Sequence, residues 1–377
     1  MGTLADKASK VLDTKRKIAA AIEQMTGRPA GDVFADYPEQ ILGIQTGGGS
    51  GWTGHADVEG LKAIGWADED IAYYQQHGVN WNEEDDQYHL VPEDNKALYG
   101  VINIGNVQQY KDILVYLPKI DTTGVTNMSG KFQNCYLLVS VPLFDTSSVI
   151  SMSSMFQGCY SLGSVPLFDT SSVTSMSYMF QNCYSLVSVP LFDTSSATSM
   201  SSMFQNCYSL VSVPLFDTSS VIYMSSMFQN CYSLGSVPLF DTSSVISMSY
   251  MFQNCYSLVS VPLFDTSSVT SMSYMLRNCY SLVSVPLFDT SSATSMSSMF
   301  QSCYSLAYIN LNNLKISVAV SATSLLEKSS LLYMIENAAP TSAITITLSA
   351  YCYDKFSNDP DLVAALSAQP LVSLASA

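Results

Sequence analysis

Hydrophobic and polar positions recur along most of the chain with a fixed period of 24 residues. One representative unit, residues 161–184, reads SLGSVPLFDTSSVTSMSYMFQNCY, and no insertion interrupts the series between residues 118 and 309. Repeated cysteines keep this spacing from Cys135 to Cys303, and each unit carries one aspartate at a constant place. A constant period of this length is typical of a solenoid, a propeller or another array of stacked units.

Each unit contains two segments with strand character and one apolar segment with helical spacing. Leu186, Val189 and Leu191 form an L-x-x-V-x-L pattern, which predicts a short strand. Residues 173–176 are a second β-prone run, and apolar residues at i, i+3, i+4 and i+7 across 176–183 predict a helix of about two turns. The predicted fold is therefore a repeat solenoid with short strands and a short helix per coil, its parallel strands stacked ~4.8 Å apart.

Two repeated polar positions admit more than one interpretation. The aspartate before Thr-Ser-Ser in each unit, such as Asp193, is expected to shape a turn by bonding nearby backbone groups. A column of calcium ions is the alternative, although acidic metal loops usually place several carboxylates in one loop. The repeated cysteines are expected to be buried free thiols, with disulfides as the alternative. No C-x-x-C occurs, so a zinc site has no support.

Tyrosine is prominent among the few differences between copies and at one repeated position. A tyrosine follows each repeated cysteine, the residue before the second methionine is Ser or Tyr, and Tyr223 replaces a further serine. Tyrosine supplies a rigid ring and a hydroxyl to a partner, while the alternative is that these rings only cover the edge of the core. The candidate receptor-binding residues are Tyr160, Tyr178, Tyr184, Tyr208, Tyr223, Tyr232, Tyr250, Tyr256, Tyr274 and Tyr280.

The region before the repeats divides into three parts by composition. Residues 1–46 are predicted to be a helical segment for attachment or oligomerisation, or else a helix that docks on its own second half. Residues 47–51 are a Gly-rich linker, and residues 52–100 are a small acidic domain with all three tryptophans and a local charge of −9. The apolar residues that carry the helical prediction are Leu4, Val11, Ile18, Ile22 and Met25.

The two ends of the solenoid are expected to be capped, because an open end exposes apolar surface and strand edges. Residues 101–117 are the predicted N-terminal cap, 118–314 the solenoid of eight coils, and 315–377 an α/β C-terminal cap. The elements expected in the last region are a helix at 323–337, a strand at 343–349, a helix at 359–367 and a strand at 371–376.

Charge and motifs exclude several classes of function. The net charge is −16 without clustered Lys and Arg, which argues against a nucleic-acid partner. No apolar run reaches membrane-spanning length, so membrane insertion is not expected, and charges in the first 17 residues interrupt any signal-peptide core. No G-x-S-x-G, P-loop or H-E-x-x-H is present, so we expect neither an enzyme nor a cofactor. A glycan hydrolase built on residues 52–100 is the minor alternative.

The repeat resembles a known family. The unit FDTSSVTSMSYMFQNCYSL at residues 168–186 is similar to the BspA-like leucine-rich repeat of bacterial surface proteins, in its FDTSxVTxMxxMFxxCxxL form. This resemblance covers roughly residues 118–314 and implies adhesion and protein binding without catalytic residues. Cell-surface members of that family usually carry export or lipoprotein signals, which this sequence does not display.

The N-terminal segment resembles a different group of proteins. Residues 8–44 contain an alanine-rich helix followed by F-x-x-Y-P-x-x-I, similar to a segment of gut bacteriophage tail fibre and baseplate-associated proteins. A virion protein is released by lysis, which would reconcile a surface-type repeat with a missing signal peptide.

Together these features predict a phage tail-associated structural protein of the receptor-binding type, located in the virion. Its solenoid would bind a host-surface glycan or protein, and residues 1–46 would bind other tail or baseplate proteins. A homotrimer formed through this helix would multiply many weak contacts. The alternative is a non-catalytic BspA-like adhesin on the bacterial cell surface, exported by another route.

Overall fold

The computed structural model describes residues 81–82, 87–88, 102–112, 114, 117 and 120–377. The chain divides into two units, Met1–Glu93 and Asp94–Ala377, and each is described by itself. In the first unit, strand β1 (Trp81–Asn82) pairs antiparallel with strand β2 (Gln87–Tyr88). The predicted helical segment 1–46 and the linker that follows it lie outside the described residues.

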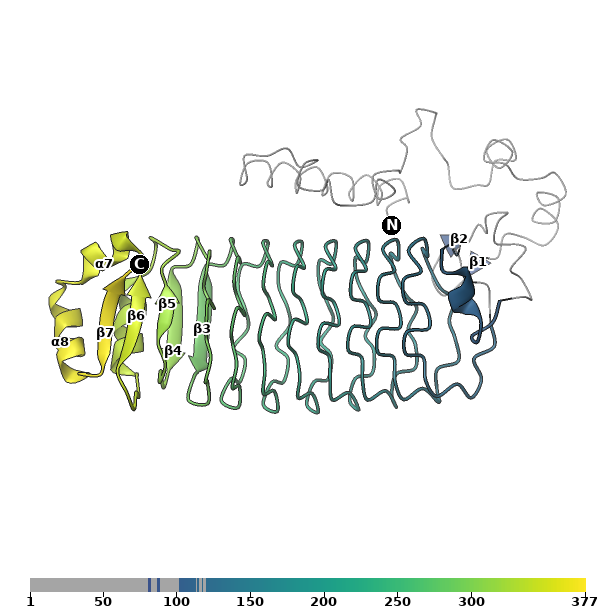
Figure 1. Ribbon diagram of the computed structural model, residues 1–377, viewed down its shortest axis with the longest axis horizontal. Helices are drawn as coiled ribbons and strands as arrows, with labels where there is room; N and C mark the ends of the chain where they lie inside the picture. Colours follow the sequence, from purple (N-terminus) through teal and green to yellow (C-terminus); the bar gives the residue numbers. More distant parts are fainter. Residues whose placement is uncertain (1–80, 83–86, 89–101, 113, 115–116, 118–119) are drawn as a thin grey trace, which may run out of the picture. The chain divides into compact units, whose positions relative to one another are not determined.

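The second unit is a solenoid of stacked coils. The coils lie side by side along the long axis of Figure 1. Parallel bridges join one position of consecutive coils along the whole series, from Asn127 with Ser151 to Ser271 with Ser295. Rings repeat in the same register, since Phe180 and Phe204 stack with centroids 5.7 Å apart and planes 6° apart. The predicted repeat solenoid is confirmed.

The interior of the solenoid consists of columns of like apolar side chains. Each column adds one residue per coil, so every buried side chain packs against its equivalents above and below. Burying a side chain of this size contributes about 1.5–3 kcal/mol, and each coil repeats the gain. In the coil of residues 173–192 the buried apolar residues are Val173, Met176, Met179, Phe180, Cys183, Leu186, Val189 and Phe192.

The predicted helix across residues 176–183 is wrong, although its apolar positions are all buried. Tyr178 and Asn182 have φ of 61° and 62°, in the left-handed region that a right-handed helix excludes. The segment is a ribbon of consecutive turns, which we call the turn ribbon. Successive tight turns also return side chains to one face every three or four residues, so the spacing alone imitates a helix.

Hydrogen bonds in the turn ribbon alternate between two kinds. The N–H groups of Met179, Gln181 and Cys183 donate to carbonyls three residues earlier, at 3.0–3.2 Å. The N–H groups of the even-numbered residues between them donate to carbonyls of the next coil, as from Phe180 to Met203 at 2.9 Å. Backbone hydrogen bonds therefore link each coil to the next. In an α-helix the same N–H groups would donate to carbonyls of the helix itself.

The extended segment differs from its prediction in one side chain. Leu186 and Val189 are buried, but Leu191 is 59% exposed and Phe192 takes its place in the core. The reason lies in Pro190, which has no N–H to give to the neighbouring coil and whose carbonyl accepts from the N–H of Phe192 at 3.0 Å. This three-residue turn rotates the chain, so the alternation of a regular strand is lost.

Regular strands are accordingly rare within the coils that the structure describes. Strand β3 (Ser284–Asp289) pairs in parallel with β4 (Tyr308–Asn312), with a register shift between Val285 and Leu287. That shift lies at the proline of the coil, as expected for a residue that cannot donate to the ladder. In the earlier coils the parallel contacts are isolated bridges.

The aspartates form turns, as predicted. Asp193 Oδ1 accepts from the backbone N–H of Ser195 at 3.0 Å and from its hydroxyl at 2.7 Å. These two bonds stabilise the carboxylate and lower the pKa of Asp193. The next residue, Thr194, donates its hydroxyl to the carbonyl of Asp217 in the following coil, at 2.6 Å.

The cysteines are free and buried, as predicted, and they also link coils. Cys183 Sγ donates to the carbonyl of Phe156 in the preceding coil at 3.1 Å, and the same bond recurs along the column. Burial raises the pKa of these thiols, to about 12 for Cys135 and Cys303. Their thiolate forms are therefore scarce near neutral pH, which makes them poor nucleophiles and metal ligands.

The segment after the last coil is an α/β structure. Strands β5, β6 and β7 form a parallel sheet in that order. Backbone bonds from Glu327 to Ala307 and from Asn313 to Asn337, both 2.9 Å, tie this segment to the last coil. None of the helices in the described part of the chain is long and apolar enough to cross a membrane. The elements are β5 Val318–Val320, α6 Lys328–Glu336, β6 Ile344–Leu348, α7 Ala350–Phe356, α8 Pro360–Ala368 and β7 Val372–Ser376.

Both predicted strands of this segment and its last helix lie within one residue of the observed elements. The helix predicted at 323–337 starts later, at Lys328, and α7 was not predicted. Helix α7 begins where the hydroxyl of Ser349 accepts from the N–H of Cys352, and it is only seven residues long.

We expect the repeated thiols to resist modification in the folded protein. At pH 8, 5,5′-dithiobis(2-nitrobenzoate) should leave them unreacted, whereas in guanidinium all nine cysteines of the chain should react. Ser220→Cys, at an exposed turn position, is the matched control and should react at once in the folded state. Equal labelling rates with and without denaturant would contradict the buried column.

Substitutions at Ser226 distinguish the turn ribbon from a helix by the sign of their effect. Ser226 has φ of 57°, so Ser226→Gly should leave the free energy of unfolding unchanged or raise it, because glycine adopts this region without strain. A helix would instead lose up to about 1 kcal/mol with glycine. Ser226→Val should cost about 1–3 kcal/mol at a left-handed position. Urea unfolding of the three proteins measures both differences.

Candidate binding surface

The tyrosines that follow the repeated cysteines form one continuous stack. Tyr184 and Tyr208 have ring centroids 4.7 Å apart and planes 6° apart. The rings are half-buried along the column, and Tyr304 at its end is exposed. Each ring therefore offers an edge and a hydroxyl to the outside while its faces are covered by its neighbours. This tyrosine column comprises Tyr136, Tyr160, Tyr184, Tyr208, Tyr232, Tyr256, Tyr280 and Tyr304.

Exposed aliphatic columns lie between this tyrosine column and the aspartate turns in every coil. One contains Leu143, Leu167, Leu191, Leu215, Leu239, Leu263 and Leu287, each at least 41% exposed, and we call it the leucine column. A valine at a second position is exposed in five coils, at Val139, Val187, Val211, Val259 and Val283. No charged residue occurs between the tyrosine and the phenylalanine of any of these segments, such as residues 184–192.

An uncharged apolar surface that continues over several coils is uncommon on the outside of a folded protein. Exposed apolar patches beyond a few hundred Å² mark contact sites for other molecules. The sequence prediction missed the leucine column because the L-x-x-V-x-L pattern assigned its leucine to the core. The available signal was the phenylalanine directly after each leucine, since two neighbouring residues of an extended chain cannot both face inward.

The tyrosines of the turn ribbon stand at its left-handed position. Tyr178, Tyr250 and Tyr274 have φ of 59–61°, where the other coils carry serine or glycine. Tyr178 and Tyr250 are 42% and 37% exposed, and Tyr223 on the neighbouring bridge position is 47% exposed. The structure stacks Tyr250 on Tyr274, with centroids 4.9 Å and planes 7° apart, while the coils beside Tyr178 carry serine.

Arg277 joins the stacked pair of tyrosines. Its guanidinium carbon lies 5.5 Å from the ring centroid of Tyr274, within the range of a cation–π contact. The side chain is half-buried, and its Nε is buried without a hydrogen-bond partner. Among the described residues the ion pairs are those of Lys328 with Asp359 and Asp361, so Arg277 has no carboxylate partner there.

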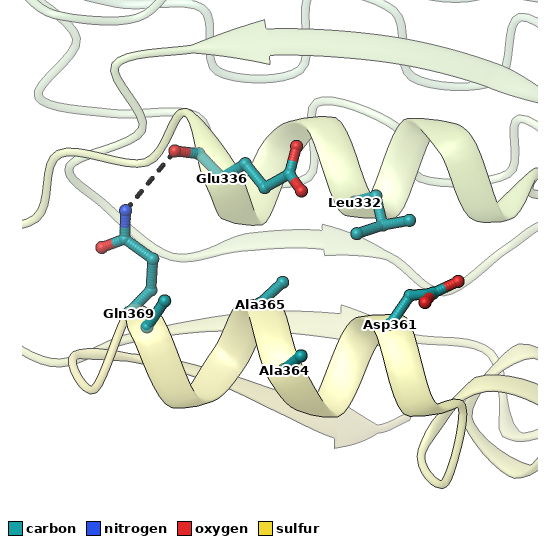
Figure 2. Close-up of a pocket in the computed structure, with 7 residues that line it drawn as sticks. Leu332, Glu336, Asp361, Ala364, Ala365 and Gln369 are labelled. Carbon is teal, nitrogen blue, oxygen red and sulfur yellow. Dashed lines mark hydrogen bonds between the residues drawn. The ribbon is translucent and has the colours of Figure 1, made fainter.

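A hollow of about 520 Å³ lies between α6 and α8. Figure 2 shows its lining, which includes Glu336, Asp361 and Gln369 but no serine, cysteine or histidine. The amide of Gln369 reaches the backbone carbonyl of Glu336 at 3.5 Å and serves structure. No group of three or more potential metal ligands occurs among the described residues.

Comparison with known proteins points to one family. Residues 105–212, 198–315 and 233–337 match the sequence profile of a family described as "Mycoplasma protein of unknown function, DUF285". These matches overlap and together span more than half of the chain. No curated protein sequence matches the chain significantly.

Solved structures similar to this chain are leucine-rich repeat proteins. A leucine-rich cell surface protein from Faecalibacterium prausnitzii is 20% identical, with a TM-score of 0.30, over 49% of this chain and 62% of its own. A leucine-rich repeat protein from Eubacterium ventriosum is 14% identical, with a TM-score of 0.29, over 59% and 80%. Internalin C2 from Listeria monocytogenes is 14% identical, with a TM-score of 0.27, over 54% and 84%.

Paired substitutions test which leucine of the extended segment faces outward. Leu191→Ser should change the free energy of unfolding by less than about 0.5 kcal/mol, as substitutions at exposed positions do. Leu186→Ser in the same coil should cost several kcal/mol, roughly 2–5, because it removes a fully buried side chain. Equal losses from the two variants in urea unfolding would contradict the exposure of the leucine column.

Proposed function

Since the chain belongs to the family described as Mycoplasma protein of unknown function, DUF285, and is a BspA-like leucine-rich repeat protein, we propose that it is a non-catalytic adhesin. In this proposal the protein acts at the bacterial cell surface and binds a macromolecule outside the cell. The observation that carries the proposal is the leucine column, an exposed apolar surface that the solenoid itself does not cover.

The geometry favours binding by many equivalent contacts. The leucine and the tyrosine recur from coil to coil at the spacing of stacked strands, and an exposed valine accompanies them in five coils, so a partner can bury a similar set of contacts on successive coils. Stable protein interfaces bury about 800 Å² on each partner, with aromatic and apolar residues at their centres. Columns of exposed leucine and half-buried tyrosine that extend over several coils supply this kind of surface.

Charge supports contact with a neutral or apolar partner surface. Between Lys131 and Lys315 the repeats carry one basic residue, Arg277, and the aspartates are confined to the turns. The leucine column itself contains no charged group, so its burial does not require the costly transfer of its own side chains' charges out of water.

A phage tail protein is the second candidate function. The observation that favours it is the tail-fibre-like segment of residues 8–44, which lies outside the described residues. In that case the same solenoid surface would bind a host receptor, and residues 1–46 would bind other tail proteins. The family match covers residues 105–337 and does not include residues 8–44, so it adds nothing to this candidate.

Localisation separates the two candidates. Antibodies against the repeats should label intact bacteria that make the protein, and protease added outside those cells should remove the signal. Labelling only after lysis, together with detection of the chain in purified phage particles, would replace the adhesin by the tail protein.

The leucine column should be required for adhesion. The triple variant Leu191→Ser, Leu215→Ser and Leu239→Ser should lower binding to cultured epithelial cells and immobilised secreted glycoproteins by at least about tenfold, equivalent to 1.4 kcal/mol. The matched control replaces three exposed apolar residues outside the column, Leu325→Ser, Tyr351→Ser and Val363→Ser, and should bind as the wild type does. Equal binding by both triple variants would eliminate the leucine column as the adhesive surface.

A further inference from the structure

One coil of the solenoid departs from the repeat more than the coils around it. In residues 273–279 the sequence SYMLRNC replaces the usual SSMFQNC, which changes three positions at once. The changes place Tyr274 at the left-handed position, Leu276 in the phenylalanine column and Arg277 in the glutamine column. Tyr250 in the preceding coil stands directly against Tyr274.

These departures do not improve the packing of the coil. The glutamine column is a ladder in which each side-chain amide donates to the next, and it stops at Gln253 because arginine has no acceptor. The buried Nε of Arg277 has no hydrogen-bond partner, although a buried donor without a partner costs roughly 1–3 kcal/mol. Bulky residues are also disfavoured at the left-handed φ of Tyr274, which is 59°.

The departures do create a local site with its own chemistry. Tyr250 and Tyr274 form a pair of parallel rings, and Tyr250 is 37% exposed. The guanidinium of Arg277 lies against the ring of Tyr274, and it is the one basic group between residues 132 and 314. A half-buried cation without a carboxylate partner attracts an anion, because charge-assisted bonds are the strongest that a guanidinium makes.

We propose that Tyr250, Tyr274 and Arg277 form a binding site for a sugar residue that carries one anionic group. The sugar ring contacts the edges and hydroxyls of the two stacked tyrosine rings, and its anionic group accepts hydrogen bonds from the guanidinium of Arg277. The proposal rests on the proposed adhesive function and names one class of ligand for it.

Serine hydroxyls adjacent to the two tyrosines in the sequence suit a sugar. The hydroxyls of Ser249 and Ser271 lie 2.6 Å apart, and those of Ser273 and Ser295 lie 2.5 Å apart. Hydroxyls of this kind both donate and accept, as sugar hydroxyls require. One aspartate per coil gives the solenoid a negative field, which favours a ligand with a single anionic group over a polyanion.

The repeat supplies variants that should fold, because each replacement is the residue that other coils carry at the same place. Arg277→Gln restores the glutamine column, and the double variant Tyr250→Ser with Tyr274→Ser restores the serine of Ser202 and Ser226. Tyr178→Ser is the matched control, since Tyr178 occupies the same left-handed position without a stacked ring or an arginine.

Titrations of the full chain with methyl β-glucuronide and methyl β-glucoside, followed by NMR, test the site. Wild type should bind the glucuronide more tightly than the glucoside. Arg277→Gln should weaken glucuronide binding about tenfold and leave glucoside binding unchanged, as expected for loss of one charged contact. The double tyrosine variant should weaken binding of both sugars, and Tyr178→Ser should change neither.

Several results would overturn the site. Equal affinity of the wild type for the two sugars would show that the site does not recognise an anionic group. An unchanged glucuronide affinity in Arg277→Gln would show the same. Binding of methyl glucoside 6-sulfate with the same dependence on Arg277 would support the site and assign sulfate as the anionic group. Cell adhesion through the leucine column is measured separately, so adhesion without glucuronide binding would refute this site alone.

Discussion

The structure depends on one constraint, which is that every second N–H of the turn ribbon donates to the next coil. A right-handed helix would direct those groups along its own axis, so the chain must turn left-handed twice in each coil to release them. One of the two places carries asparagine in most coils, with Gly158 and Ser302 as the exceptions, and the other place carries serine, tyrosine or glycine. These residues make the left-handed turns possible. These hydrogen bonds align consecutive coils, so equivalent residues in the rest of each coil also lie next to one another.

Because equivalent residues of consecutive coils face one another, a side chain suits its position only if it packs well against the same side chain in the neighbouring coils. Phenylalanine and tyrosine stack on their copies, asparagine donates to asparagine, and cysteine donates to a backbone carbonyl of its neighbour. A charged side chain in such a column would meet its own charge in each adjacent coil. The low share of charged residues in the repeats therefore reflects stacking, and the aspartates occur in turns where bonds from a serine stabilise each carboxylate.

The sequence was sufficient for the architecture but not for the conformation of the coil. The period, the buried thiols and the aspartate turns could be predicted because each depends on spacing or on local side-chain chemistry. The turn ribbon could not, because Met176, Met179, Phe180 and Cys183 have the same spacing in a helix and in successive turns. Within residues 176–183, Asn182 was the one residue whose type favours a left-handed conformation. The outward rotation of Leu191 required knowledge of how Pro190 breaks the ladder. The contact between Arg277 and Tyr274 could not be predicted either. The 24-residue period marks each of these residues as different from the repeat, but it does not show that their side chains meet.

The uninterrupted 24-residue period also has a consequence at the level of the gene. Because the units are nearly identical in amino-acid sequence, insertion or removal of whole units in the gene keeps every column of the protein aligned. The length of the solenoid can therefore change in discrete steps between descendants of one cell. A population can vary its reach by this route without evolving a new fold, and single-residue variants such as the coil of Arg277 can be copied or lost in one step.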